Sequence, residues 1–250
     1  MEGSDTILPR IFMAKQIAEM QVEAATMELP DTKTLRLQWP QGYDPEFKTG
    51  QFITLYFADS PTYKRAYSLS SCALDRGFYE VTIKREGSMG TRIVDWVQPG
   101  NKVWVIPPAG RFLPVFEPDK HLLCLAGGSG VTPFRAFARE ATRRSLATRI
   151  TILYSVKTAN DIIFNKEFRK LEQENPHFKF LVTCTRLAAD DPWPGRRGRI
   201  EASWVREQIG DPQNTVFYAC GPNAMVEAAE RLVTEGLKVP KEQMKVEKWG

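Results

Sequence analysis

Hydrophobic and polar residues follow two different patterns along the chain, and the patterns meet near residue 118. Before that point, short runs of alternating or apolar-aromatic residues recur between glycines and prolines. Strand-length segments at this spacing predict a small antiparallel barrel. The predicted strands are residues 34–39, 51–57, 66–70, 78–84 and 102–106. One helix is predicted over residues 88–97, because its apolar residues recur at helical spacing.

After residue 118, continuous apolar runs alternate with amphipathic segments. This pattern predicts a parallel sheet with helices on both faces. The predicted strands are residues 121–126, 149–154, 178–183, 215–220 and 244–249, and the predicted helices are 133–144, 161–174, 201–208 and 223–235. We therefore expect two domains, residues 1–117 and residues 118–250.

Composition narrows the class of protein. The 250 residues are 42% hydrophobic, and the longest apolar runs are far too short to cross a bilayer. The first residues lack the basic and apolar regions of a secretory signal, so a cytoplasmic protein is expected. Thirty-four basic and thirty acidic residues give a net charge of +4, well short of the basic stripe of a nucleic-acid binder. We expect neither nucleic acid nor membrane as a partner.

Metal and nucleophile chemistry are poorly supported by the sequence. The four cysteines are widely spaced, and only two histidines are present. Without a CxxC, HExxH or Cys/His cluster, neither a zinc site nor a cysteine-ligated iron–sulfur cluster is expected on this chain. His121 and His177 have no GxSxG motif to serve, so both are expected to be structural or surface residues.

Two glycine turns predict a nucleotide site at one edge of the parallel sheet. The predicted strand 121–126 runs into Gly127-Gly-Ser-Gly130, and Thr132-Pro133 predicts a helix N-cap followed by proline at the first helical position. Free amides at a helix start attract phosphate. Cys220-Gly221-Pro222 ends another strand of the same sheet. The loop is neither GxGxxG nor a P-loop, and a merely tight turn is the alternative interpretation.

The barrel half carries its own candidate ligand-binding residues. Arg65-Ala66-Tyr67-Ser68 places an arginine, an aromatic ring and a hydroxyl on one strand. Arginine suits a pyrophosphate and tyrosine suits stacking on a flat ring, although a packed barrel wall is the alternative. Gly87-Ser-Met-Gly-Thr91 opens the predicted barrel helix and offers amides to a second anion.

Taken in order, these motifs resemble those of ferredoxin–NADP reductase-like flavoproteins. The resemblance runs from about residue 12 to the end and also includes Gly50-Gln-Phe52 and Pro108-Ala-Gly110. It implies a β plus α/β fold of two domains. The first is a six-stranded antiparallel Greek-key barrel that binds flavin. The second is a doubly wound parallel sheet that binds NADPH or NADH. The implied flavin is FAD, with FMN as the alternative.

The resemblance also implies roles for individual residues. Arg65 binds the flavin phosphate, Tyr67 stacks on the flavin ring, and Ser68 hydrogen-bonds near its N5. The further residues implied to contact the flavin are Ala66, Thr82, Ile83, Lys84, Met89, Gly90 and Thr91. Those implied to hold the nicotinamide nucleotide are Gly128, Ser129, Gly130, Thr132, Pro133, Cys220, Gly221 and Pro222. Trp249 is implied to cover the flavin until the nicotinamide displaces it, or else it completes the core. Ser68, Cys220 and Trp249 are the expected catalytic residues.

The choice between NADPH and NADH depends on the residues that follow the strands of the parallel sheet. Thr185-Arg186 follows the third predicted strand of the parallel sheet, where relatives that prefer NADPH place a hydroxyl and an arginine on the 2′-phosphate. Arg196, Arg197 and Arg199 add positive charge nearby, whereas Asp190 and Asp191 offset it. NADPH is favoured slightly, and NADH remains the alternative.

The implied reaction is hydride transfer from NAD(P)H to flavin N5, with the electrons passing on to a separate acceptor. The expected acceptor is a ferredoxin- or flavodoxin-like carrier or an oxygenase component, which Lys64 and Arg92 would steer electrostatically. One alternative is a reductase of small acceptors such as free flavin, ferric chelates or quinones. Another is a flavin-binding sensor without turnover. A monomer is expected.

Overall fold

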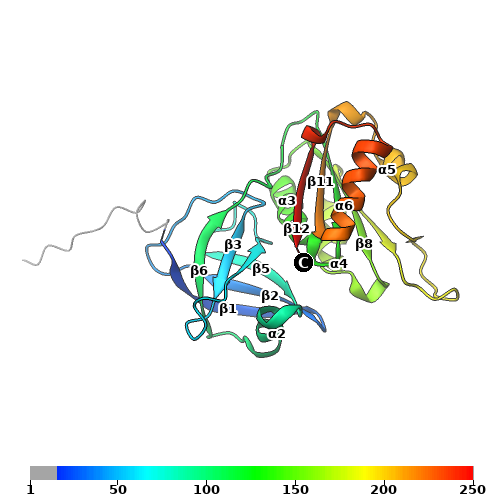
Figure 1. The fold of residues 1–250 in the computed structure, drawn as a ribbon. Coiled ribbons are helices and arrows are strands. Elements are labelled where there is room, and N and C mark those ends of the chain that lie inside the picture. Colours follow the sequence, from blue (N-terminus) through cyan, green and yellow to red (C-terminus); the bar gives the residue numbers. More distant parts are fainter. Residues whose placement is uncertain (1–15, 250) are drawn as a thin grey trace, which may run out of the picture.

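The computed structural model describes residues 16–249, and these form two sheets joined by the segment that follows β6 (Figure 1). The strands of the first sheet are all antiparallel, and one helix, α2, packs beside the sheet. Its strands are β1 (Ala18–Leu29), β2 (Thr32–Gln38), β3 (Phe52–Tyr56), β4 (Arg65–Ser68), β5 (Phe78–Lys84) and β6 (Lys102–Ala109). Helix α2 spans Gly87–Trp96.

The first sheet closes into a barrel. Its strand order is β4-β3-β6-β1-β2-β5, and a bridge between Leu69 and Val81 joins the two outer strands. Alternate residues such as Leu35, Ile53 and Tyr79 are fully buried inside it. The expected six-stranded antiparallel barrel is therefore confirmed.

The second sheet is parallel throughout, with the order β10-β9-β8-β7-β11-β12. Its strands are β7 (His121–Gly127), β8 (Arg149–Val156), β9 (Phe178–Cys184), β10 (Arg196–Arg197), β11 (Thr215–Pro222) and β12 (Met244–Trp249). Helices α3 (Thr132–Arg143) and α4 (Asn165–Glu174) pack on one face, and α5 (Ala202–Gln208) and α6 (Asn223–Arg231) on the other. Every residue of β7 is buried, which explains its continuous apolar sequence.

Four elements differ from the pattern-based prediction. Strand β1 was not predicted at all. The helix expected over 161–174 begins only at Asn165, because Phe164 adopts a left-handed conformation (φ 59°) that interrupts it. The helix expected over 223–235 ends at Arg231 and continues as one π-helical turn, Leu232–Gly236. The two-residue β10 is also new.

All four cysteines are free and buried. Two of them lie in the central strands of the parallel sheet, Cys124 in β7 and Cys220 in β11. Burial raises the pKa of each thiol above its ordinary value. Within residues 16–249, no helix is long and apolar enough to span a bilayer. The same residues contain no cluster of three or more histidine, cysteine or acidic side chains arranged to hold a metal ion.

His121 makes the fold sensitive to acid. Its ring is 2% exposed, its Nε2 lies 2.9 Å from the Thr151 hydroxyl, and its Nδ1 has no hydrogen-bond partner among the described residues. Burial, with Arg149 and Lys179 nearby, lowers its pKa to about 4. The unfolded chain binds this proton near pH 6.5, so it holds more protons than the folded chain between the two values.

We therefore expect stability to fall as the pH drops from 6.5 to 4, with His121 contributing a loss of ~3 kcal/mol. Urea unfolding at pH 7 and pH 4.5 measures this loss, and His121→Gln should reduce it. An equal loss in the variant would show that His121 is not its source.

Candidate functional site

Ser68, Cys220 and Glu247 meet where the barrel touches the parallel sheet. The Ser68 hydroxyl donates to Glu247 Oε2 at 2.7 Å, and Cys220 Sγ lies 3.7 Å from the same oxygen. They come from β4, β11 and β12, and Cys220 pairs directly with Glu247 across the last two strands. The carboxylate thus links the barrel to the ends of the parallel strands.

Glu247 was missed by the sequence interpretation, which considered only Trp249 in this last predicted strand. The available signal was a carboxylate two positions before that tryptophan on a strand predicted to lie in the same sheet as Cys220. What the sequence did not supply is the register that places the carboxylate opposite the cysteine.

The environment of this cluster keeps its sulfur neutral. Burial raises the pKa of Cys220, and the adjacent Glu247 raises it further, so the thiol is a hydrogen-bond donor and not a thiolate. Burial also raises the pKa of Glu247, although its bonds from Ser68 and Cys220 oppose that effect. The cluster can orient a hydroxyl at this joint, and it has no nucleophile.

The other residues of the Arg65–Ser68 strand lie at the barrel surface. Tyr67 packs partly against the barrel core, and burial raises its pKa, so the phenol stays protonated. Arg65 and Ala66 are exposed. The Arg65 guanidinium lies 4.3 Å from the Tyr63 ring centre and has no carboxylate partner in the described part of the chain. It is therefore available to an anion.

The remaining predicted flavin residues lie on β5 and α2. Ile83 and Met89 belong to the barrel core, and the buried Thr82 hydroxyl is 2.8 Å from that of Thr34. Gly90 lets α2 approach β5, because a side chain there would meet the Lys84 carbonyl group. Thr91 is exposed on the same helix.

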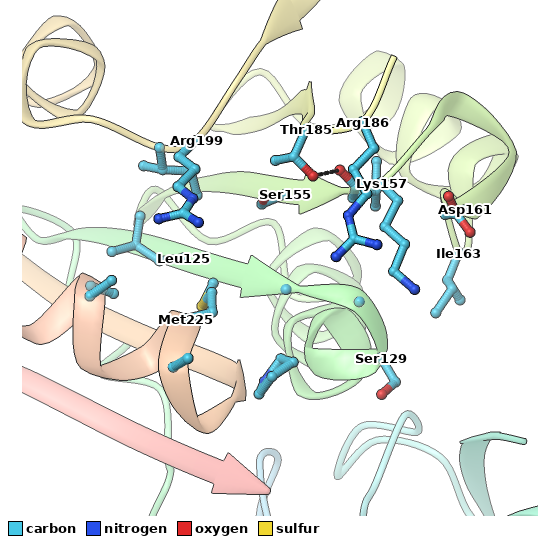
Figure 2. Close-up of a pocket in the computed structure, with 18 of the residues that line it drawn as sticks. Leu125, Ser129, Ser155, Lys157, Asp161, Ile163, Thr185, Arg186, Arg199 and Met225 are labelled. Atoms are coloured by element: carbon cyan, nitrogen blue, oxygen red, sulfur yellow. Dashed lines mark hydrogen bonds between the residues drawn. The ribbon is translucent and has the colours of Figure 1, made fainter. Parts of the chain in front are cut away.

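A cavity of about 620 Å³ opens between the barrel and the parallel sheet (Figure 2). This volume lies within the range of small-molecule sites, about 300–1,000 Å³. Its barrel side includes Thr32 and Lys84, and its other side includes the glycine turn that follows β7. Seven of the predicted site residues line it: Lys84, Gly128, Ser129, Thr185, Arg186, Pro222 and Trp249.

The glycine turn exposes its backbone to this cavity. Strand β7 ends at Gly127, and Gly128–Val131 forms one 3₁₀ turn that runs directly into α3. Gly128 has φ 54°, and the space beside its Cα is open, so a ligand can approach the peptide closely.

The predicted N-cap at Thr132 is wrong. Thr132 already has helical angles (φ −54°, ψ −54°), because the 3₁₀ turn continues into α3 without an extended residue between them. Its hydroxyl therefore donates to the Ser129 carbonyl at 2.6 Å instead of accepting from the helix. Pro133 lies in the first turn of α3 as expected, and both residues are buried.

The two predicted glycine turns pack directly against each other. A side chain on Gly130 would collide with the Cys220 carbonyl group and come within 2.8 Å of the Gly221 Cα. Gly130, Cys220 and Gly221 are buried behind the cavity wall. Trp249 pairs with Pro222 at the end of β12, borders the cavity and packs against the core beside α3. Trp249 thus contributes to the core, and its role in covering the flavin stays a prediction.

Four cations line the cavity: Lys157, Arg186 and Arg199, together with Lys84, which is ion-paired with Asp31 and Glu86. Figure 2 shows the Lys157 and Arg186 side chains extending side by side toward Ser129, with Arg199 farther along the sheet edge. In the described part of the chain Lys157, Arg186 and Arg199 form no ion pair, so their side of the cavity favours an anionic ligand, although Glu86 and Asp161 also line the cavity.

The predicted cations Arg196 and Arg197 are engaged elsewhere. Arg196 lies 3.5 Å from Glu207, and Arg197 donates to the carbonyls of Ala188 and Asp191. Lys157, which the sequence interpretation did not count, takes their place. The signal for it was a lysine just after the second strand of the parallel sheet.

These features fit two phosphate-containing ligands. The exposed glycine backbone and the unpaired cations suit a nucleotide diphosphate beside the parallel sheet. On the barrel, Arg65 and the start of α2 suit a second phosphate, and Tyr67 supplies an aromatic surface for a flat ring. The Ser68–Glu247–Cys220 cluster lies between the two.

Comparison with known proteins agrees with this division. Residues 19–113 match the Oxidoreductase FAD-binding domain family, and residues 124–231 match the Oxidoreductase NAD-binding domain family. The chain is 28% identical over 228 residues to ferredoxin--NADP reductase B of Sorangium cellulosum, covering 88% of this chain and 92% of that one. It is 28% identical over 191 residues to the glycine betaine monooxygenase reductase subunit of Chromohalobacter salexigens, covering 75% and 52%.

The fold is also that of a solved relative. A ferredoxin NADP+ reductase from Neisseria gonorrhoeae, crystallised with bound FAD and NADP, superposes with a TM-score of 0.77 at 24% identity, covering 93% of this chain and 98% of that one. The chain spans about half the length of some curated relatives and nearly all of others. With its FAD-binding and NAD-binding domains in this order, the chain belongs to the ferredoxin–NADP reductase-like family of flavoproteins.

Proposed function

We propose that this protein is an NADPH-dependent flavoprotein reductase that passes electrons to a separate acceptor. The observation that carries the proposal is the Ser68–Glu247–Cys220 cluster. It joins the barrel strand that matches the flavin motif to the parallel-strand ends that border the nucleotide cavity. Two ligands held on either side of such a joint face each other.

On the barrel side, Arg65, Gly90 and Thr91 hold the flavin phosphate and Tyr67 supports the ring. Bound flavin supplies the redox chemistry, because it accepts two electrons as a hydride and releases them singly. Glu247 holds the Ser68 hydroxyl in one orientation at the joint, and Cys220 stays a neutral neighbour. Trp249, at the cavity wall, limits the access of water.

On the other side, the Gly128–Ser129 backbone holds the nucleotide pyrophosphate. The adjacent cations Lys157 and Arg186 suit the additional phosphate that distinguishes NADPH from NADH (Figure 2). The Thr185 hydroxyl donates to the Val156 carbonyl at 3.0 Å, so Thr185 orients the turn that carries Arg186.

Arg186→Ala should therefore weaken the use of NADPH and leave that of NADH nearly unchanged. Loss of one charge-assisted hydrogen bond is worth about 1.5–3 kcal/mol, or about a 10- to 100-fold rise in the KM for NADPH. Steady-state kinetics with both donors measure the ratio. Arg196→Ala removes the same charge from the neighbouring, ion-paired position and should not change it. An equal rise for NADH would refute 2′-phosphate recognition by Arg186.

The acceptor is proposed to be a ferredoxin- or flavodoxin-like carrier or an oxygenase component. The two curated relatives are named as a ferredoxin--NADP reductase and a monooxygenase reductase subunit, which supports the ferredoxin and oxygenase alternatives. Arg92 is a poor candidate for steering it, because both of its terminal nitrogens bond Asp59 at 2.8 Å. Lys64 has no such partner among the described residues and lies 5.1 Å from the Tyr56 ring centre. Cytoplasmic location and a monomeric state stay predictions.

An anaerobic titration tests the proposed function. The purified protein, reconstituted with FAD, is titrated separately with NADPH and NADH while the visible flavin absorbance is recorded. The proposal expects bleaching at about one equivalent of NADPH. A flavin spectrum indifferent to both nucleotides would contradict it and favour a sensor without turnover. Retention of FMN in preference to FAD would correct the cofactor.

A further inference from the structure

Helix α3 is bonded to the barrel along much of its length. Arg135 and Arg139 bond Glu80 of β5, and Arg143 lies 2.5 Å from Asp75. Glu140 accepts a hydrogen bond from Thr49. The same helix begins where the glycine turn of the nucleotide cavity ends. Contacts that fix this helix therefore also fix that turn relative to the barrel.

The centre of this interface is a square of two arginines and two glutamates. Arg135 and Arg139 are one helical turn apart, and each donates from Nη1 to Glu80 Oε2 at 2.9 Å. Each also donates from Nε to Glu167 of α4, at 2.8 and 2.5 Å. Helix α3 is thus held between the barrel and its own domain, and it cannot shift without breaking bonds on one side.

Glu80 is the only barrel residue in this square, and its carboxylate is fully used. Its second oxygen accepts from Arg36 of β2 at 2.8 Å, and its side chain is 6% exposed. Burial alone would raise the pKa of Glu80, but Arg135, Arg139 and Arg36 outweigh it and hold the pKa below its ordinary value. The carboxylate is therefore ionised and bound by three guanidiniums.

Glu80 lies on a strand that connects these bonds to both parts of the candidate site. Lys84, at the end of the same strand, lines the nucleotide cavity, and Ser68 lies on β4 at the other side of the barrel closure. A displacement of α3 against β5 therefore changes the distance between the glycine turn and the barrel surface that bears Tyr67 and Ser68.

We propose that Glu80 is a positioning residue for hydride transfer, which acts through Arg135 and Arg139 to fix the glycine turn of the parallel-sheet domain against the barrel. The inference rests on the proposed function, because it assumes that the two ligands occupy opposite sides of the domain joint. Glu80 is not among the residues that line the cavity, so the proposal does not require it to contact either of the two ligands. Its effect is on the distance and angle between them, to which hydride transfer is far more sensitive than nucleotide binding is.

The first experiment measures rapid-reaction flavin reduction in the FAD-loaded Glu80→Gln variant. We expect the limiting rate to fall by about 10- to 100-fold, because misplacement by about 1 Å has effects of that size. The dissociation constant for NADP+, measured by calorimetry, should change less than about threefold, since α3 keeps its bonds to Glu167. Arg36→Gln removes a Glu80 partner within the barrel and leaves the domain joint intact, so its limiting rate should match wild type.

The second experiment reads the domain arrangement without turnover. The native cysteines are buried, so spin labels can be placed on Gln98→Cys in the barrel and Gln173→Cys on α4, both exposed positions. Glu80→Gln should broaden or shift the measured distance distribution, and Arg36→Gln should not. If Glu80→Gln does not fold, Arg139→Gln keeps the bond from Arg135 and should show a smaller change of the same kind.

An unchanged limiting rate or an unchanged distance distribution in Glu80→Gln would overturn the inference. So would a loss of rate that Arg36→Gln shares. Failure of the wild-type protein to be reduced by NADPH would refute the proposed function instead, and the distance measurement would still report whether Glu80 sets the domain arrangement.

Discussion

Alanine at Gly130 is expected to abolish nicotinamide nucleotide binding while flavin stays bound. The new Cβ would collide with the Cys220 carbonyl group and crowd the Gly221 Cα, and both obstacles are backbone atoms that cannot rotate away. The turns that follow β7 and β11 must then separate. Overpacking of this kind costs about 1–3 kcal/mol, and the separated turn no longer presents its amides to phosphate. We expect the affinity for NADP+ to fall by at least about 100-fold.

Calorimetry with NADP+ measures this loss, and the flavin absorbance of the same sample reports the barrel domain. Gly210→Ala is the matched control. It lies in the same domain with open space around its Cα and no positive φ, so it should bind NADP+ as wild type does. Unaltered nucleotide affinity in Gly130→Ala would show that the contact between the turns is dispensable.

Glu247→Ala is expected to slow flavin reduction by about 100-fold with little change in flavin content. The substitution leaves Ser68 and Cys220 without their shared acceptor and removes the side chain that connects β12 to β4. A reaction that depends on the alignment of two rings loses rate when that alignment loosens. Rapid mixing with NADPH measures the limiting rate. A wild-type rate would place Glu247 outside the reaction machinery.

Glu247→Gln separates the hydrogen bond from the charge. Burial raises the pKa of Glu247, so the folded protein holds this proton more tightly than the unfolded chain does. Stability from this group is therefore present at low pH and is lost as the pH rises through the raised pKa. We expect Glu247→Gln, which is never charged, to increase the Tm at pH 8 and not at pH 4. A lower Tm at pH 8 would mean that the carboxylate is stabilised by its surroundings.

The elements that the sequence predicted most directly are the strands whose residues are buried on both faces of the sheet. Strand β7 is buried on both sides, and its run of apolar residues is hard to interpret otherwise. Strand β1 was not predicted because its sequence, AEMQVEAATMEL, is rich in helix-forming residues and only Met20 and Val22 are fully buried. Pairing with β2 and β6 overrides that local preference.

The site was predicted where its motifs are local and missed where it depends on register. Ser68 and Cys220 belong to recognisable turns or strands, but the carboxylate that joins them is separated from Ser68 by 179 positions. The bonds from Arg135 and Arg139 to Glu80 also join residues far apart in the sequence, so they cannot be predicted from the hydrophobic periodicity. Local sequence also misled the prediction at Thr132, because a 3₁₀ turn and an N-cap have the same sequence signature here.

The burial of all four cysteines affects how well they resist oxidation during the proposed reaction. Reduced flavins react with dioxygen, so a flavoprotein in air is exposed to peroxide at its own surface. Peroxide attacks thiolates, and each cysteine here is enclosed and held in the thiol form. Repeated aerobic turnover should therefore leave the sulfur of its cysteines unoxidised, without any reducing agent to protect it.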